Sequence, residues 1–182
     1  MAIVSGRWSA DGAGLFTVSE DGSIKIWSRS GMLRSTVIQG SDPIIYACWS
    51  PNSTSIAFCQ GGNIAIKPLA ANSKLLKWKA HDGLVLCIAW SAINNIIISS
   101  GEDHRYKIWD EDGTNLFTSS PEEFSMTSLA FCPTKNLIAI GGFNNLKLCD
   151  LSGWVYDSKS FNDEKVGSLQ SISWSPDGTQ IV

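Results

Sequence analysis

The chain has few of the residues from which enzymes and metalloproteins build their sites. Its 182 residues include only two histidines, and its five cysteines contain no C-x-x-C pair, which leaves too few ligands for a zinc site. Neither a G-x-x-x-x-G-K phosphate loop nor a dinucleotide-binding fingerprint occurs in the sequence. We therefore expect no metal, no cofactor and no small-molecule substrate.

Basic charge and long apolar runs are also scarce. The 14 lysines and arginines are outnumbered by 17 aspartates and glutamates, so the net charge of −3 favours neither a nucleic acid nor an anionic membrane as partner. The longest apolar run, residues 84–90, is far below the roughly 20 residues that span a bilayer, and no signal-peptide pattern opens the chain. The odd number of cysteines is typical of reduced thiols in an intracellular protein. We expect no nucleic-acid partner and no membrane insertion.

What the sequence does have is an aromatic residue at nearly constant spacing. Trp8, Trp49, Trp90, Phe131 and Trp174 are separated by 41, 41, 41 and 43 residues. Each follows an apolar stretch and precedes a turn, most often one with Ser, Pro, Asp or Gly, and short runs of alternating apolar residues come next. Four short strands in a repeat of about 41 residues are typical of one blade of a WD40 β-propeller.

The sequence therefore predicts an all-β, incomplete WD40 β-propeller that fills the whole chain. It should contain about four four-stranded antiparallel blades and the start of a fifth. We expect the blades at approximate residues 2–38, 43–79, 83–119 and 124–160, with residues 168–182 opening the next one.

An open arc of blades has consequences for its loops and its ends. The loops on the rim are candidates for binding, because a rigid scaffold holds them in place. They are expected at residues 41–42, 81–82, 121–123 and 157–167, the last being the longest connection. Both end sheets should expose apolar side chains such as Ile3, Leu169 and Ile172, so we expect the isolated chain to associate with itself.

Two repeats carry the polar residues that hold a WD40 blade together. Such a blade links a turn carboxylate, a histidine, a hydroxyl and an indole N–H in one hydrogen-bonded chain, because each group needs a partner when it leaves water. The candidate residues are His81, Ser99, Asp103 and Trp109 in the third repeat, and Thr17, Asp21 and Trp27 in the first. The histidine of the first repeat would fall before Met1.

The set Ser99, His81 and Asp103 also matches the residue types of a hydrolase triad. Ser99 has no G-x-S-x-G elbow around it, and Trp109 completes the structural set at the right spacing. We interpret these residues as structural and expect no catalytic residue. The other histidine, His104, is expected to lie in a solvated turn.

The second and fourth repeats depart from this pattern. Their positions for Asp, Trp and His hold, in that order, Gly61, Lys67 and Gly40 in the second repeat and Phe143, Cys149 and Glu122 in the fourth. We expect these two blades to depend on apolar packing alone. The lysines within residues 74–79 are interpreted as protection of an exposed edge strand rather than as a nucleic-acid patch.

Several stretches are more particular than a generic WD repeat and resemble the intraflagellar transport protein 80 family, WD-repeat subunits of the intraflagellar transport B complex. One of them, residues 66–69, reads Ile-Lys-Pro-Leu where a generic blade would have Trp-Asp. The others are residues 20–28, 31–36, 78–83, 148–150 with 153–154, and 177–181.

The resemblance implies a non-enzymatic scaffold that covers part of a first propeller. Its partners would be other subunits of the intraflagellar transport B complex. It would serve the assembly and maintenance of cilia, at the cilium, the ciliary basal body and the cytoplasm or cytoskeleton. No partner-binding residue can be transferred from the family. The alternative is a generic WD40 adaptor that recruits substrates to a ubiquitin ligase or belongs to a vesicle coat.

Overall fold

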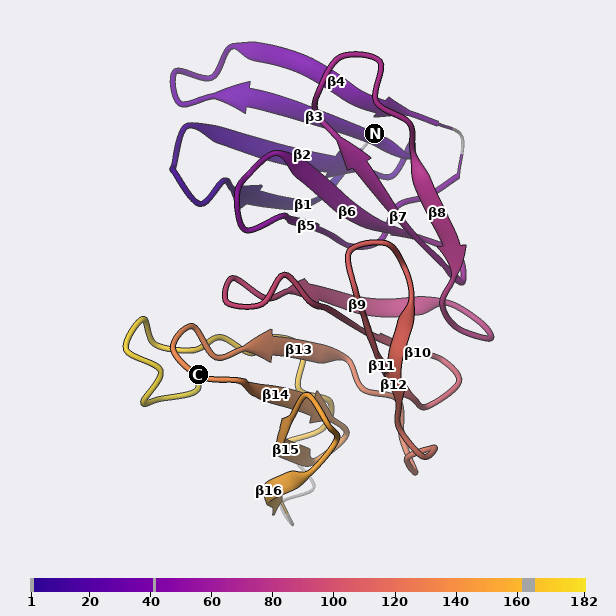
Figure 1. Cartoon of the computed structure of the whole chain (residues 1–182), viewed down its shortest axis with the longest axis vertical. Coiled ribbons are helices and arrows are strands. Elements are labelled where there is room, and N and C mark those ends of the chain that lie inside the picture. The colour runs from indigo at the N-terminus through magenta and orange to yellow at the C-terminus, as the bar shows by residue number, and fades with distance from the viewer. Residues whose placement is uncertain (1, 41, 162–165) are drawn as a thin grey trace.

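The chain folds into four sheets of four antiparallel strands each (Figure 1). The computed structural model describes residues 2–40, 42–161 and 166–182. Within these residues the regular secondary structure consists of β-strands, without a helix. Strands that are consecutive in the sequence are neighbours in every sheet, so each sheet is a simple antiparallel meander. The predicted all-β class and the four four-stranded antiparallel sheets are thereby confirmed.

The four sheets follow one another along the chain. The first sheet contains β1 (Ile3–Trp8), β2 (Gly14–Ser19), β3 (Ser23–Ser28) and β4 (Leu33–Gln39). The second contains β5 (Ala47–Trp49), β6 (Ser55–Gln60), β7 (Asn63–Pro68) and β8 (Leu76–Lys79). The third contains β9 (Val85–Trp90), β10 (Ile97–Gly101), β11 (Tyr106–Trp109) and β12 (Asn115–Thr118). The fourth contains β13 (Ser128–Phe131), β14 (Leu137–Gly142), β15 (Asn145–Asp150) and β16 (Val155–Ser160).

The apolar core is divided into three clusters, one between each pair of adjacent sheets. Strand β6 shows how the alternation of side chains along a strand produces this division. Its Ile56 and Phe58 are buried in the cluster shared with the first sheet, whereas Ala57 and Cys59 are buried in the cluster shared with the third. An inner sheet therefore has two apolar faces, which explains why its central strands read as nearly continuous apolar runs.

Tryptophans of the recurring series also connect neighbouring sheets by hydrogen bonds. The indole Nε1 of Trp49 donates to the carbonyl oxygen of Arg7 in the first sheet, at 3.0 Å. The indole Nε1 of Trp174 donates in the same way to the carbonyl oxygen of Ala130 in the fourth sheet, at 3.1 Å. Each indole thus satisfies its own donor and fixes its segment against the sheet before it.

Glycines in the outer turns make room for aromatic side chains of the preceding sheet. Gly113 and Gly153 occupy the same position in the last turn of the third and fourth sheets, with φ of 83° and 84°. Trp78 of β8 lies over Gly113, and Phe117 of β12 lies over Gly153, where a Cβ atom would collide with the ring. Gly31, the equivalent in the first sheet, has a φ of 82° but nothing within 4 Å of a Cβ.

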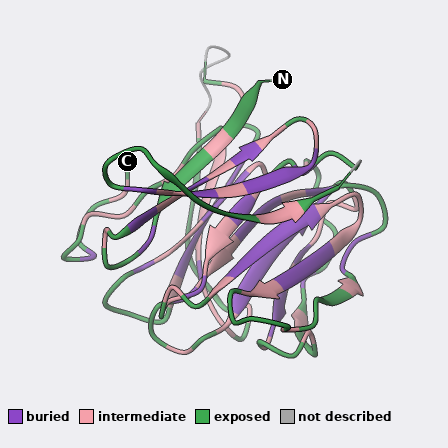
Figure 2. Ribbon diagram, turned by 90° about the horizontal axis from the view of Figure 1, so that it is seen from above, coloured by how far each residue is buried: buried purple, intermediate pink, exposed green. Residues whose placement is uncertain are grey.

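The first and fourth sheets lie at opposite ends of the arc (Figure 1). Strand β1 is exposed along nearly its whole length, as the green strand at the N-terminus of Figure 2 shows, and Ile3 is 63% exposed as predicted. Leu169 and Ile172 are half-buried, so the prediction for them is wrong. The reason is that the segment after residue 166 docks on the fourth sheet, where the hydroxyls of Thr127 and Ser128 both donate to the carbonyl oxygen of Leu169. Self-association of the chain stays a prediction, which light scattering can measure.

One loop prediction also needs correction. Residues 157–160 are not part of a long connection, because β16 pairs with β15 as far as the Asn145–Ser160 pair. Residues 162–165 of that predicted loop, and residue 41 of another, lie outside the described residues.

Candidate functional site

The turn end of the third sheet contains a continuous chain of hydrogen bonds, which we call the third-sheet network (His81, Ser99, Asp103 and Trp109). His81 precedes β9, Ser99 lies in β10, Asp103 lies in the turn after β10, and Trp109 ends β11. The ring of His81 places Nδ1 2.8 Å from Asp103 Oδ1 and Nε2 2.8 Å from Ser99 Oγ. Trp109 Nε1 lies 2.9 Å from the same Ser99 Oγ. The structure thus brings all four predicted residues of this repeat together.

The protonation states give the network a single direction. Burial lowers the pKa of His81, and the hydrogen bond that His81 donates to Asp103 opposes this only in part, so the ring is neutral near pH 7. Burial works to raise the pKa of Asp103, but the hydrogen bond from His81 holds it below its ordinary value. The ionised carboxylate can only accept, so His81 Nδ1–H donates to it. Ser99 then donates its hydroxyl to Nε2 and accepts from the Trp109 indole, and every group is satisfied.

Two neighbours reinforce the carboxylate end of this network. Lys107 Nζ lies 3.6 Å from Asp103 Oδ2 and donates to the carbonyl oxygen of Ala80 at 2.6 Å. The backbone N–H of Arg105 donates to Asp103 Oδ1 at 3.3 Å. Lys107 did not belong to the predicted set, and the signal that could have found it is its place two residues before Trp109 on the alternating strand.

The hydrogen-bond distances in the third-sheet network are within the range of a catalytic triad, but the hydroxyl of Ser99 is not accessible to a substrate. Ser99 is 0% exposed and His81 is 1% exposed, so no substrate can reach the hydroxyl. Ser99 Oγ also accepts the indole N–H of Trp109, so its lone pairs and its proton are already engaged within the network. A nucleophile needs an open position beside a base, and this site has none.

The first sheet contains only part of the same arrangement. Trp27 Nε1 donates to Thr17 Oγ1 at 2.8 Å, as the equivalent pair does in the third sheet. Asp21 Oδ1 accepts from the backbone N–H of Ser23 at 2.9 Å and makes no hydrogen bond to Thr17. Without a histidine between them, the hydroxyl and the carboxylate are not joined.

The second and fourth sheets differ from the other two in the length of the turn between their second and third strands. In the first and third sheets this turn comprises residues 19–23 and 101–105, five residues in each case, between the pairs Val18–Ile24 and Ser100–Tyr106. Between the equivalent pairs of the second and fourth sheets, Cys59–Ile64 and Gly141–Leu146, lie residues 60–63 and 142–145, one residue fewer, and the two outer residues of each of these turns still pair with each other. The prediction that Gly61 and Phe143 occupy the aspartate position is therefore wrong, because the shorter turn has no such position.

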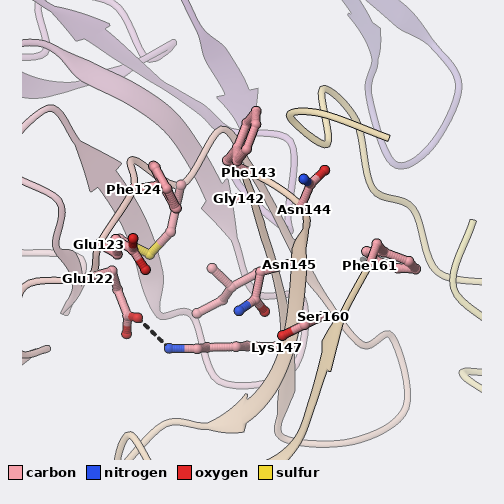
Figure 3. Close-up of a pocket in the computed structure, with 12 residues that line it drawn as sticks. Glu122, Glu123, Phe124, Gly142, Phe143, Asn144, Asn145, Lys147, Ser160 and Phe161 are labelled. Carbon is pink, nitrogen blue, oxygen red and sulfur yellow. Dashed lines mark hydrogen bonds and ion pairs between the residues drawn. The ribbon is translucent and has the colours of Figure 1, made fainter. Parts of the chain in front are cut away.

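The fourth sheet replaces the network with an ion pair beside a cavity. Glu122, at the position of His81, accepts a hydrogen bond from Lys147 Nζ, and both side chains are about three-quarters buried. Next to this pair lies a cavity of about 470 Å³, which we call the fourth-sheet cavity (Figure 3). Phe124 and Phe143 form its upper edge in that view, with ring centroids 5.1 Å apart. The expectation of apolar packing alone is wrong for this sheet.

His104 is less exposed than predicted. It is half-buried with a φ of 58°, and its Nδ1 lies 3.2 Å from the carbonyl oxygen of Glu122. The backbone N–H of Glu122 donates in return to the carbonyl oxygen of His104 at 2.8 Å. His104 thus links the turn of the third sheet to the loop that carries the ion pair.

The serines that follow Trp8, Trp49 and Trp174 have a role that the sequence did not predict. Ser9 Oγ donates to Asp11 and accepts from the backbone N–H of Gly14, which closes the first hairpin turn from within. Ser50 and Ser175 make the same pair of bonds in their own turns. The signal was present as the repeated Ser-x-Asp/Asn spacing, which is typical of side chains that replace backbone turn partners.

The described residues offer neither a metal site nor a membrane-spanning helix. Among residues 2–40, 42–161 and 166–182, no three His, Cys, Asp or Glu side chains lie close enough together to hold a metal ion. The described part of the chain also contains no helix long and apolar enough to cross a membrane. The five cysteines are free thiols, and burial raises the pKa of Cys87 and of Cys149 to about 11.

The comparisons with known proteins agree with this architecture. The WD40 family, described as WD domain, G-beta repeat, matches residues 2–28 and 72–110. The intraflagellar transport protein 80 homologs of Mus musculus and Rattus norvegicus are each 46% identical to the chain over 180 residues, which is 99% of its length. The chain belongs to the intraflagellar transport protein 80 family. The resemblance read from the short sequence stretches is confirmed, and the chain spans 23% of the length of these two family members.

Matches outside the intraflagellar transport protein 80 family are weaker. The protein SEC13 homolog of Drosophila melanogaster is 26% identical over 134 residues, covering 66% of this chain and 38% of that protein. A chain in the crystal structure of a mitotic checkpoint complex superimposes with a TM-score of 0.85 over 98% of this chain and 56% of its own length. Its sequence identity is 22%, so this likeness shows the shared propeller fold alone.

Proposed function

We propose that the protein is a non-enzymatic WD40 scaffold subunit of the intraflagellar transport B complex and serves the assembly and maintenance of cilia. The observation that carries this proposal is the 46% identity, sustained over 99% of the chain, to relatives named for intraflagellar transport. Its partners are other subunits of that complex, contacted through protein surfaces, and its place is the cilium, the ciliary basal body and the adjoining cytoplasm or cytoskeleton.

The geometry of the turn ends supports a role without catalysis. The buried Ser99 and the fully satisfied third-sheet network are suited to holding one blade together and not to chemistry. We assign the same structural role to Thr17, Asp21 and Trp27 in the first sheet. The blades in this proposal run over residues 2–38, 43–79, 83–119 and 124–160, with residues 168–182 opening the next. Rigid sheets with loops at one rim are a common basis for recognition of other proteins.

The direct test is removal of the gene from a ciliated cell, followed by imaging of the axoneme and analysis of the transport trains. We expect short or absent cilia and trains that lack further subunits of the complex. Re-expression of the intact gene should restore both, and a tagged copy should appear along the cilium and at its base. Cilia of normal length with unchanged trains would overturn the proposal and favour the generic adaptor.

A further inference from the structure

The fourth-sheet cavity has a composition that points to a particular kind of ligand. It opens at the rim where loop 119–127, the turn after β14 and the end of β16 meet (Figure 3). The buried side chains of Met126 and Ile140, 4% and 2% exposed, contribute its apolar lining. A volume of about 470 Å³ exceeds that of one side chain and lies within the range of about 300–1,000 Å³ that is usual for ligand sites.

The cavity exists because the fourth sheet lacks the third-sheet network. In the third sheet, the ring of His81 fills the space beside the strand, and a Cβ atom at Gly101 would collide with it. In the fourth sheet, the shorter turn and the substitution of Glu122 for the histidine leave that space open. The site is therefore a local property of this sheet.

The charges that line the cavity favour a cation. Glu122 is already paired with Lys147, which is the only lysine or arginine among the described residues that line the cavity. Glu123 also lines the cavity, is exposed, and has no ion-pair partner among the residues that the structure describes. Among these described residues, two carboxylates and one ammonium leave a net charge of −1, and a bound anion would face both carboxylates.

The aromatic rings favour a planar cation. Phe124 is 47% exposed and Phe143 is 43% exposed, although both rings stand beside the opening and touch each other. Phe161 lines the other side, where Figure 3 shows it at the right. A guanidinium group stacks on aromatic faces and is less strongly hydrated than an ammonium, so arginine suits these walls better than lysine.

We propose that the fourth-sheet cavity binds an arginine side chain in an exposed segment of a partner protein. The guanidinium lies against Phe124 and Phe143 and donates hydrogen bonds to the carboxylate of Glu123. An apolar residue next to the arginine fills the remaining volume over Met126 and Ile140. This inference rests on the proposed role as an interaction scaffold, to which it adds the chemistry of one contact.

The test uses the purified chain and a series of fluorescein-labelled, capped pentapeptides with the sequence Gly-Leu-Xaa-Leu-Gly, in which Xaa is Arg, Lys, citrulline or Glu. Fluorescence anisotropy measures the dissociation constant of each. We expect the arginine peptide to bind about tenfold more tightly than its neutral citrulline isostere, the sum of one cation–π contact and one exposed ion pair. Lysine should lie between the two, and glutamate should not bind. Equal binding of the arginine and citrulline peptides, or tighter binding of glutamate, would overturn the proposal.

Three variants separate this site from a general attraction of cations to an acidic chain. Glu123→Gln should weaken binding of the arginine peptide only about threefold, since an exposed ion pair is weak. Glu20→Gln removes an equal charge from an exposed turn of the first sheet and should leave binding unchanged. Lys147→Gln removes the competing ammonium and should tighten binding, whereas an anion site would lose its ligand. Circular dichroism checks that each variant is folded.

The peptide experiment is independent of the ciliary test. Absence of peptide binding together with lost cilia after gene removal would reject the arginine site and leave the proposed function intact. Peptide binding together with normal cilia would do the reverse.

Discussion

The third and fourth sheets have the same four strands and the same order, but they close their turn ends by different means. The third sheet has a five-residue turn that presents Asp103 to His81, and the resulting network is buried and complete. The fourth sheet has a turn one residue shorter, an ion pair in place of the histidine contact, and a cavity beside it. The difference teaches that the sheets of this arc are held by their apolar interfaces, and that the polar turn end is free to vary.

The last turns of the first and fourth sheets offer a second comparison, because only the turn of the fourth sheet packs against a sheet that precedes it in the sequence. Gly31→Ala and Gly153→Ala place the same Cβ atom at the same backbone conformation, but only Gly153 lies under the ring of Phe117. Both substitutions should cost roughly 1–2 kcal/mol for a left-handed conformation. Gly153→Ala should cost a further ~1–3 kcal/mol from overpacking, the largest effect that we predict. Urea unfolding of the two variants measures the difference, and equal losses would show that the packing of Phe117 is unimportant.

Removal of the carboxylate should have the next largest effect. In Asp103→Ala, the Nδ1–H of the buried His81 loses its acceptor, which should lower the free energy of unfolding by about 1–3 kcal/mol. Asp21→Ala is the matched control in the first sheet, where the carboxylate accepts only from its own turn, and its loss should be smaller. Urea unfolding and amide hydrogen exchange in β10 and β11 test this. A stable Asp103→Ala variant that had lost a hydrolytic activity would instead support the triad interpretation.

The ion pair of the fourth sheet should contribute less than the network that it replaces. A double-mutant cycle with Glu122→Gln and Lys147→Met should give a coupling energy below ~1 kcal/mol, because neither side chain is fully removed from water. The coupling should fall further in 0.5 M salt, which screens partly exposed charges. A coupling energy larger than the cost of Asp103→Ala would show that the ion pair stabilises the fourth sheet more than the network stabilises the third.

The smallest effect is expected from pH, since burial and the contact with Asp103 act on His81 in opposite directions. The pKa of His81 is lower in the folded chain than its unfolded value of about 6.5, so the unfolded state binds the proton first. Stability is therefore complete above about pH 6.5 and falls as the pH drops below it. The lowered pKa of Asp103 adds a second loss as the pH falls below about 4. His81→Gln should remove the first loss, as urea unfolding at pH 5 and 7.5 can show. It should also reduce the second loss, because the hydrogen bond from His81 is what lowers the pKa of Asp103.

The spacing of aromatic residues was sufficient to predict the number of sheets and the strands within them. Alternation and turn residues recur in each repeat, so a strand that is poorly marked in one repeat can be located from its equivalents in the others. The third-sheet network was predictable for a similar reason, because its four residue types occur at spacings that the blade geometry imposes. The strand boundary at Ser160 was not, since the exposed residues of β16 have no apolar alternation to mark them.

The fourth-sheet cavity could not be predicted, because it arises from what is missing. No pattern joins Glu122 to Lys147 across 25 residues until the sheet has formed, and neither residue type is unusual. Phe143 stands where the repeat pattern leads one to expect an aspartate, but this residue alone does not indicate that the turn is one residue shorter. The register of β14 against β15 decides this, and register depends on the pairing of whole strands.

The tryptophan bonds between sheets have a direction that matters while the chain is being made. Trp49 and Trp174 each reach back to a carbonyl oxygen of the sheet that precedes them in the sequence. In these two cases the acceptor has therefore already left the ribosome when the donor emerges. During synthesis from the N-terminus, the segment that carries Trp49 or Trp174 can therefore dock on a sheet whose strands have already been made.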